Sequence, residues 1–489
     1  MFTRTFRTSI LLASLLAVGS PALGGPLTPP GGPVTSTGKT TQEIFDKVAA
    51  AEPRTPLSAA TTPGDGTCIF KITQPGSYYL TGILHGVSFQ TGIRISLTVP
   101  GGVTIDLNGF GVRGGADTLS GIDIIGGNNA RVVVRNGYVY LWDGNGVDLT
   151  GAESGEIENV HSSSNFGTDF VITQGSISNC KAAINSGGGF VAGASSSLTQ
   201  CEAINNSGTG FDTDVNCRLT QCTAKANTSR GFDCEASNTL TQCIATGNSN
   251  YGFNCLLSCT LLNCVASTNT GAGISVSGSG TVTGCVSRGN TQWGYTTGAR
   301  TVFQSCTARE NTFDGFNAPF STIIECDSSD NTGSGFSLGG ITSVYNSSAM
   351  SNTGSGIIGG GACLVVNCNV RYNTGAGIEL TLDNNTIRGN LCIGNGTGSG
   401  NAANIRTAGI NNRIEDNNCT LADRGIEVDG TRSIIVRNTC GSNTQNWAIA
   451  ANNSYGPIID RSAAATAAAN ANSAASTLAS TDPNANFSY

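Results

Sequence analysis

The chain has 489 residues, of which 67 are glycine and only 12 % are charged, and its formal net charge is −7. So few charged side chains argue against helical bundles and coiled coils, and glycine does not recur at every third residue as it does in collagen. The negative charge argues against a nucleic-acid partner, which would require a basic face, and the composition favours an acidic, β-rich protein.

The first 24 residues have the pattern of a secretory signal peptide. Arg4 and Arg7 precede a short apolar run at 10–18, and small residues follow at 20–24. The run is too short to span a bilayer, so the sequence predicts export to the extracellular space, the periplasm or the cell surface, with no transmembrane segment. A Pro/Gly/Thr linker is expected over 25–40.

A short capping helix and its lead-in are predicted over 41–65. Thr40 and Glu43 have the spacing of a capping box, and Ile44, Phe45 and Val48 would share one side of a helix. Such a helix would cover the open end of a repeat structure, whose first strand otherwise exposes its edge.

A repeat of about 21 residues then dominates the chain. An anchor residue recurs ten times, nine times as cysteine and once as Ser347. Asparagine always follows five residues after the anchor, glycine nine after and an aromatic or aliphatic residue ten after, while an apolar residue stands three before. The anchors are Cys180, Cys201, Cys222, Cys243, Cys264, Cys285, Cys306, Cys326, Ser347 and Cys368.

These columns favour a single-stranded right-handed parallel β-helix with about 21 residues per coil. A leucine-rich repeat of similar period would need leucines in its second half, where segments such as 228–239 are rich in Ser and Thr instead. Short alternating pairs such as Phe232 with Cys234 indicate several brief strands per coil. Stacked coils would place like residues about 4.8 Å apart, so the asparagine column is expected to bond along the stack rather than to bind sugar.

The β-helix is predicted over 66–456, followed by an Ala/Asn/Ser-rich tail over 457–489. Ile405, Ile426 and Ile449 are expected to continue the aromatic and aliphatic column. Phe487 and Tyr489 are candidates for docking on the last coil.

The asparagine column, the Asn-x-x-x-Gly-Phe turn and the segment 103–109 (VTIDLNG) resemble right-handed parallel β-helix proteins of the pectin-lyase-like superfamily. The segment 74–80 (QPGSYYL) is similar to the first coil of exported bacterial members of unassigned function. The resemblance implies this fold over about residues 66–456. It also implies an acidic polysaccharide as the substrate class of related lyases and hydrolases, although neither catalytic signature matches residue by residue.

The 18 cysteines permit thiols or disulfides in an exported protein. Neighbours in the anchor column suit buried thiols better, because the spacing of adjacent strands exceeds the usual Cβ separation of a disulfide. Three pairs with a five-residue spacing are more suggestive of disulfide bonds: Cys217/Cys222, Cys259/Cys264 and Cys363/Cys368. With only two histidines and no Cys-x-x-Cys, zinc sites and cysteine–histidine catalysis are poorly supported.

One group of outward residues is the candidate site. Asp212 and Asp214 are expected on one strand and Asp233 and Glu235 beside them on the next, with Arg230 or Lys225 nearby. Four such carboxylates would repel, so a cation would bind between them or some pKa values would rise. Oxygen ligands suit Ca²⁺, a raised carboxyl beside an ionised one suits glycosidic cleavage, and a solvated acidic face is the third interpretation.

A second outward column, Glu379, Arg406 and Glu427 with Asp429 nearby, predicts a salt-bridge ladder across coils.

Three functions follow from these patterns. The sequence favours a monomeric, secreted β-helix that binds extracellular or cell-envelope polysaccharide, because the regular coils between 180 and 380 lack the long loops of a catalytic groove. The alternatives are a lyase or glycoside hydrolase acting on acidic polysaccharide, with Asp212, Asp214, Asp233, Glu235 and Arg230 as its machinery, and a structural or adhesive rod. No cofactor other than Ca²⁺ is expected.

Overall fold

The computed structural model describes Thr40, Glu43 and residues 53–489, apart from 127–128, 398–401 and 461–480. The chain divides into two compact units, Met1–Pro53 and Arg54–Tyr489. The predicted signal peptide, linker and capping helix fall in the first unit, mostly outside the described residues. Thr40 and Glu43 do make the reciprocal hydrogen bonds of a capping box, at 2.8 and 3.1 Å.

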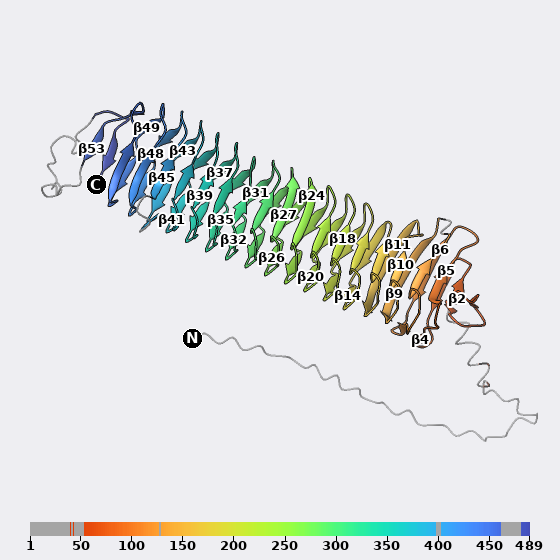
Figure 1. Cartoon of the computed structure of the whole chain (residues 1–489). Coiled ribbons are helices and arrows are strands. Elements are labelled where there is room, and N and C mark those ends of the chain that lie inside the picture. The colour runs from red at the N-terminus through yellow and green to blue at the C-terminus, as the bar shows by residue number, and fades with distance from the viewer. Residues whose placement is uncertain (1–39, 41–42, 44–52, 127–128, 398–401, 461–480) are drawn as a thin grey trace, which may run out of the picture. The chain divides into compact units, whose positions relative to one another are not determined.

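The second unit is a parallel β-helix of about 19 turns with about 21 residues per turn (Figure 1). One regular turn comprises β15 (Phe190–Ala192), β16 (Ser197–Thr199) and β17 (Glu202–Ile204), and each strand pairs in parallel with its equivalent in the next turn. Phe190 pairs with Phe211, which confirms that the sequence period is the physical pitch. Among the described residues 53–489 there is no helix, and no described helix is long and apolar enough to cross a membrane.

Three ladders of strands form three faces, called faces 1, 2 and 3 in chain order within a turn. Face 1 contains β2 (Cys68–Ile72), β5 (Thr91–Ile95), β8 (Ile122–Ile124), β10 (Val147–Leu149), β12 (Phe170–Ile172), β15, β18 (Phe211–Thr213), β21 (Phe232–Cys234), β24 (Phe253–Leu257), β27 (Ile274–Gly278), β30 (Tyr295–Thr297), β33 (Phe316–Asn317), β36 (Phe336–Leu338), β39 (Ile357–Gly359), β42 (Ile378–Leu380), β45 (Ala403–Thr407), β48 (Arg424–Val428) and β51 (Gln445–Ile449).

Face 2 contains β1 (Thr55–Pro56), β3 (Gly76–Tyr79), β6 (Gly102–Asp106), β9 (Arg131–Tyr140), β11 (Ser154–Ser163), β13 (Gly175–Ser178), β16, β19 (Arg218–Thr220), β22 (Thr239–Thr241), β25 (Thr260–Leu262), β28 (Thr281–Thr283), β31 (Val302–Gln304), β34 (Thr322–Ile324), β37 (Ser343–Tyr345), β40 (Leu364–Val366), β43 (Thr386–Arg388), β46 (Arg413–Glu415), β49 (Ile434–Val436) and β52 (Ser454–Tyr455).

Face 3 begins with β4 (Leu84–His85) and β7 (Gly111–Arg113), after which β9 and β11 extend across faces 2 and 3. It continues with β14 (Lys181–Ala183), β17, β20 (Thr223–Lys225), β23 (Ile244–Thr246), β26 (Val265–Ser267), β29 (Val286–Arg288), β32 (Thr307–Arg309), β35 (Asp327–Ser329), β38 (Ser348–Met350), β41 (Asn369–Arg371), β44 (Leu391–Ile393), β47 (Asn418–Thr420), β50 (Thr439–Gly441), β54 (Asn486–Ser488) and β53 (Ile458–Asp460).

The core consists of columns of identical or similar side chains. The rings of Phe190, Phe211, Phe232 and Phe253 stack with centroids 4.7 Å apart, and all four are fully buried. Ile405 and Ile426 continue this column as predicted. The expectation for Ile449 is wrong by two residues, because Trp447 pairs with Ile426 and Ile449 pairs with Val428.

An asparagine ladder closes the corner between faces 3 and 1, as the repeat predicted. In the regular turns the backbone N–H and the Nδ2 of one asparagine donate to Oδ1 of the next, for example at 3.1 and 3.0 Å from Asn206 to Asn227. The glycine column makes room for it. A Cβ at Gly210 would lie 2.9 Å from Nδ2 of Asn227 and 2.6 Å from the oxygen of Gly231.

The anchor cysteines form the equivalent ladder at the corner between faces 2 and 3. The backbone N–H of Cys264 donates to Sγ of Cys285 at 3.3 Å, and that of Cys326 donates to Oγ of Ser347 at 3.1 Å. All 18 cysteines are buried and free, so the pairs with five-residue spacing are not disulfides. Burial raises the pKa of the Cys180 and Cys368 thiols to about 12.

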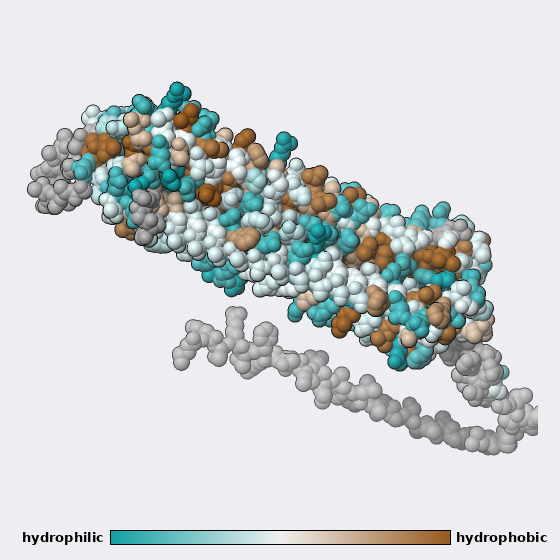
Figure 2. All heavy atoms as spheres, viewed as in Figure 1, coloured by the Kyte–Doolittle hydropathy of each residue, from teal (hydrophilic) through white to brown (hydrophobic). Residues whose placement is uncertain are grey.

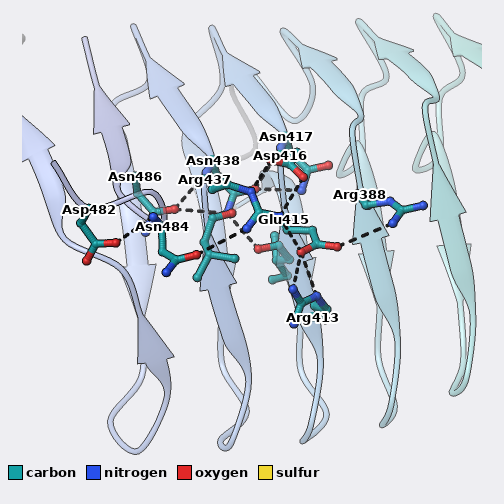
Figure 3. A network of polar contacts seen from close by, with 12 residues as sticks. Arg388, Arg413, Glu415, Asp416, Asn417, Arg437, Asn438, Asp482, Asn484 and Asn486 are labelled. Atoms are coloured by element: carbon teal, nitrogen blue, oxygen red, sulfur yellow. Dashed lines mark hydrogen bonds and ion pairs between the residues drawn. The ribbon is translucent and has the colours of Figure 1, made fainter. Parts of the chain in front are cut away.

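The C-terminal residues complete the last turns. β54 pairs with β50 and with β53, and Asn486 extends an asparagine ladder through its bond with Asn438. Beside it, Glu415 accepts hydrogen bonds from Arg413 and Arg437 (Figure 3).

Hydrophobic and polar residues are unevenly distributed over the surface. On the side seen in Figure 2, the middle of the β-helix is largely pale, and brown hydrophobic residues gather over the N-terminal turns. This pale stretch agrees with the Ser-, Thr- and Gly-rich composition of the regular turns.

Candidate functional site

The outer surface of face 1 carries one outward residue per turn, immediately after the buried aromatic column. Strand alternation turns this residue to solvent because its two neighbours point into the core. Over seven consecutive turns the residue is polar, and the strand register places each member beside the next. This polar file consists of Asp212, Asp233, Asn254, Ser275, Thr296, Asn317 and Ser337.

The predicted carboxylates lie at the N-terminal end of the polar file. Asp212 and Asp233 are register neighbours on β18 and β21, and Asp214 and Glu235 follow one residue beyond the ends of these strands. Burial, together with the negative charges of Asp233 and Glu235, raises the pKa of Asp212. The structure therefore places the four predicted carboxylates close enough for their charges to interact.

Arg230 lies in the same neighbourhood but is already engaged. Its Nη1 donates to Oδ2 of Asp233, while Oδ1 of Asp233 accepts from Nδ2 of Asn254 at 2.7 Å. Lys225 does not join them, because it ends β20 on face 3, where it pairs with Ile204 and Thr246. In the described part of the chain no three His, Cys, Asp or Glu side chains are grouped so that they could hold a metal ion, and the calcium site stays a prediction.

Aromatic residues flank the polar file, and the repeat pattern did not predict them. Tyr251, Trp293 and Phe313 lie in the turns that lead into face 1, where most other turns have small residues (Ser, Thr, Gly or Ala). The rings of Trp293 and Phe313 meet edge to face with centroids 5.1 Å apart, and Phe313 is 44 % exposed. The only signal in the sequence is their departure from the small-residue turn consensus.

Asp314 joins this aromatic group. The backbone N–H of Ser334 donates to its Oδ1 at 2.7 Å, and Trp293 also hydrogen bonds to its carboxylate. Burial raises the pKa of Asp314. These contacts fix the carboxylate, which leaves it poorly placed for chemistry on a ligand.

The second charged column is a salt-bridge ladder, as predicted. Arg406 contacts Glu379 at 3.2 Å, Asp429 at 3.0 Å and Glu427 at 3.7 Å. With three carboxylates around one guanidinium, the column joins consecutive turns of face 1 and has no free cation for a ligand.

Comparisons with known proteins concern the fold. Residues 120–262 match the family described as "Right handed beta helix region". No curated protein matches the chain. The first strands and the repeats on both sides of the matched segment continue the same ladders.

Several solved structures are similar to the chain. Pectate lyase Pel9A is 18 % identical with a TM-score of 0.31, over 49 % of this chain and 71 % of that one. The A-module of the Azotobacter vinelandii mannuronan C-5 epimerase AlgE6 is 14 % identical with a TM-score of 0.26, over 78 % and 89 %. The periplasmic alginate epimerase AlgG is 9 % identical with a TM-score of 0.27, over 72 % and 77 %.

The family match agrees with the strand ladders, so the right-handed parallel β-helix predicted from the sequence is confirmed.

Proposed function

We propose that this right-handed parallel β-helix binds an extracellular or cell-envelope polysaccharide along the outer surface of face 1, without cleaving it. The observation that carries the proposal is the polar file of seven turns beside the aromatic residues Tyr251, Trp293 and Phe313. Turns repeat about every 4.8 Å, which is close to the length of one sugar unit, so successive hydroxyl groups can meet successive turns. Aromatic faces and short polar side chains are the usual partners of sugar rings and hydroxyls.

Binding is favoured over cleavage because Asp233 and Arg230 are already hydrogen bonded to each other. Asp233 accepts hydrogen bonds from Arg230 and Asn254, which leave it little freedom to act as a nucleophile. A lyase would need a free cationic or basic group beside the sugar carboxylate, and Arg230 is bound to Asp233 instead.

The alternative of a glycoside hydrolase has one specific observation in its favour. Asp212 has a raised pKa and stands beside Asp233 at the spacing of adjacent strands, about 4.8 Å between backbones. Retaining hydrolases hold their two carboxyl groups about 5 Å apart, with one protonated. Release of reducing ends from neutral or acidic polysaccharides, lost in Asp212→Asn, would establish hydrolysis and displace the binding proposal.

The binding proposal is tested with the mature chain, residues 25–489, and a panel of soluble polysaccharides in affinity electrophoresis. Trp293→Ala and Thr296→Val remove the aromatic and the hydroxyl contact from face 1. Thr260→Val, an outward residue of β25 on face 2, is the matched control. We expect at least a tenfold loss of affinity for the two face 1 variants and none for the control, and equal binding by all three would contradict the proposal.

Calcium is examined in the same preparation. Stabilisation of the chain by millimolar Ca²⁺ in a thermal shift experiment, absent in Asp212→Asn, would establish the predicted calcium site. An unchanged melting temperature would exclude it. We also propose that the protein is exported as a monomer, and the alternative of a structural rod stays open. Cell fractionation tests export, and light scattering tests the oligomeric state.

A further inference from the structure

A pocket of about 400 Å³ lies at the corner between faces 3 and 1 in the N-terminal part of the β-helix. Its walls come from the same corner of four successive turns. Arg113 ends β7, Leu141 and Asp143 follow β9, Phe166 follows β11 and Ile184 follows β14. A volume of this size is in the range of small-molecule sites. None of these residues belongs to the polar file or to the carboxylate group.

A break in the repeat creates the pocket. The corner after β7 contains eight residues (114–121), whereas the corners of the next three turns contain six each (141–146, 164–169 and 184–189). Gly114, Gly115 and Ala116 of the longer corner form one wall. In solenoids, functional loops are usually the places where the regular turn is interrupted.

The floor of the pocket exposes large apolar side chains from three consecutive turns. Phe166 is 70 % exposed, Ile184 64 % and Leu141 43 %. In the next turn the residues in register with Phe166 and Ile184 are Ser186 and Asn205. Apolar residues held in water by three consecutive turns point to a ligand that covers them.

The backbone at this corner favours other residue types. Leu141 and Ile184 adopt left-handed conformations with φ of 64° and 58°, and the same position is left-handed in later turns, for example at Asn205 and Ala226. This conformation is unfavourable for a β-branched residue such as Ile184, and the asparagine of the next turn tolerates it much better.

The rim supplies one donor and one acceptor that are free. In the described part of the chain neither the Arg113 guanidinium nor the Asp143 carboxylate pairs with another side chain, although most arginines of the β-helix are in salt bridges. Opposite charges on one rim favour a ligand that is neutral and carries both hydroxyl donors and acceptors. A uronate would be attracted by Arg113 and repelled by Asp143, so its charge gives it no net advantage over a neutral sugar at this rim.

We propose that this pocket binds a single neutral sugar unit, the end or a branch of a glycan, with one face of the ring stacked on Phe166 and its hydroxyls bonded to Arg113 and Asp143. The site is separate from the polar file of face 1 and does not depend on it. An apolar side chain of a partner protein would cover Phe166 and Ile184 but would leave the two charged groups of the rim unused.

The test uses the mature chain and isothermal titration with cellohexaose, mannohexaose and laminarihexaose, with hexagalacturonate as the acidic comparison. Phe166→Ser and Ile184→Asn install the residues of the next turn at the same register, so the fold is retained and the melting temperature of Ile184→Asn should rise. We expect saturable binding of a neutral hexasaccharide, weakened at least tenfold by each substitution, and no tighter binding of hexagalacturonate.

Trp293→Ala on face 1 separates this proposal from the previous one, since it should leave pocket binding unchanged while it weakens polysaccharide binding. Phe166→Ser should have little effect on the face 1 site. The absence of saturable binding by all three neutral hexasaccharides, or unaltered binding by a correctly folded Phe166→Ser variant, would overturn the pocket proposal. Tighter binding of hexagalacturonate than of the neutral sugars would overturn its choice of ligand.

Discussion

At the scale of single residues, Asp169 is the most unusual member of the repeat. It occupies the column that is glycine in the following turns, and its buried carboxylate reaches the start of the asparagine ladder. It accepts hydrogen bonds from Ser162 and Asn165, both at 2.6 Å, and from Asn185. Burial outweighs these bonds and raises the pKa of Asp169 from 3.8 to about 7.

This raised pKa predicts a pH dependence of stability with a definite sign. Between pH 3.8 and about 7 the folded protein keeps a proton on Asp169 that the unfolded chain has released. The free energy of unfolding therefore falls as pH rises through this window, by up to about 4 kcal/mol, and stays low above it. Asp169→Asn should remove this slope in urea denaturation, whereas Asp117→Asn, an exposed control, should keep it. A slope that survives in Asp169→Asn would contradict the assignment.

The cysteine ladder makes a second prediction at this scale. Sγ of Cys326 accepts the backbone N–H of Cys306 at 3.5 Å, and the hydroxyl of Ser347 does the same for Cys326 at 3.1 Å. Cys326→Ser should thus be nearly neutral, because it keeps the acceptor. Cys326→Ala leaves a buried N–H without its partner and should cost about 1 kcal/mol or more in urea denaturation. Equal stability of the two variants would show that packing, rather than hydrogen bonding, selects cysteine here.

At the scale of elements, the stacked aromatic column of face 1 provides the core of each turn. Phe232 lies 4.7 Å from both Phe211 and Phe253 and is fully buried. Phe232→Ala should reduce the free energy of unfolding by about 3–5 kcal/mol, through lost burial and the cavity that remains. Phe232→Ile should cost clearly less, since Ile274 holds the same column two turns later. Chemical denaturation of the pair gives the comparison, and an equal loss would argue against a column that accepts either side chain.

The elements also show what the sequence could predict. Residues one period apart were expected to touch, and they do, because parallel strands bring each turn into register with the next. The inward columns, the asparagine ladder and the adjacency of Asp212 with Asp233 all follow from this spacing alone. Within the regular turns, residues at equivalent positions of consecutive turns are register neighbours in the strand ladders.

Features that do not follow the 21-residue repeat could not be predicted from the sequence. Lys225 lies on a different face from Asp233, since the corner 226–231 between β20 and β21 turns the chain from face 3 to face 1. Trp447, by contrast, takes the position that was expected for Ile449, because it stands one 21-residue period after Ile426 whereas Ile449 stands 23 residues after it and pairs with Val428. The pocket near Phe166 depends on the path of a corner two residues longer than those of the next three turns, which no column encodes.

At the scale of the whole β-helix, its C-terminal end is closed by the last strand, β54. This strand pairs with β50 and β53 and carries Asn486, which continues the ladder from Asn438. Deletion of residues 484–489 should leave two strand edges exposed, and such edges promote association between chains. We expect faster hydrogen exchange in Thr439–Gly441 and concentration-dependent self-association by light scattering. Asn486→Ala, which keeps the strand and loses the side-chain hydrogen bonds to Asn438, Ile435 and Gly456, should remain monomeric.

The three corners of the β-helix have a consequence for how such a chain can change in length. Each polar ladder residue bonds to its counterparts and to backbone or side-chain groups of its own and adjacent turns, so duplication of a complete turn reproduces these contacts. Insertion of a single residue inside a strand would instead misalign inward and outward side chains for the rest of that turn. Evolutionary growth or shortening of this protein is therefore restricted to whole turns, and smaller insertions accumulate at the corners, where new binding surfaces can arise without disturbing the interior.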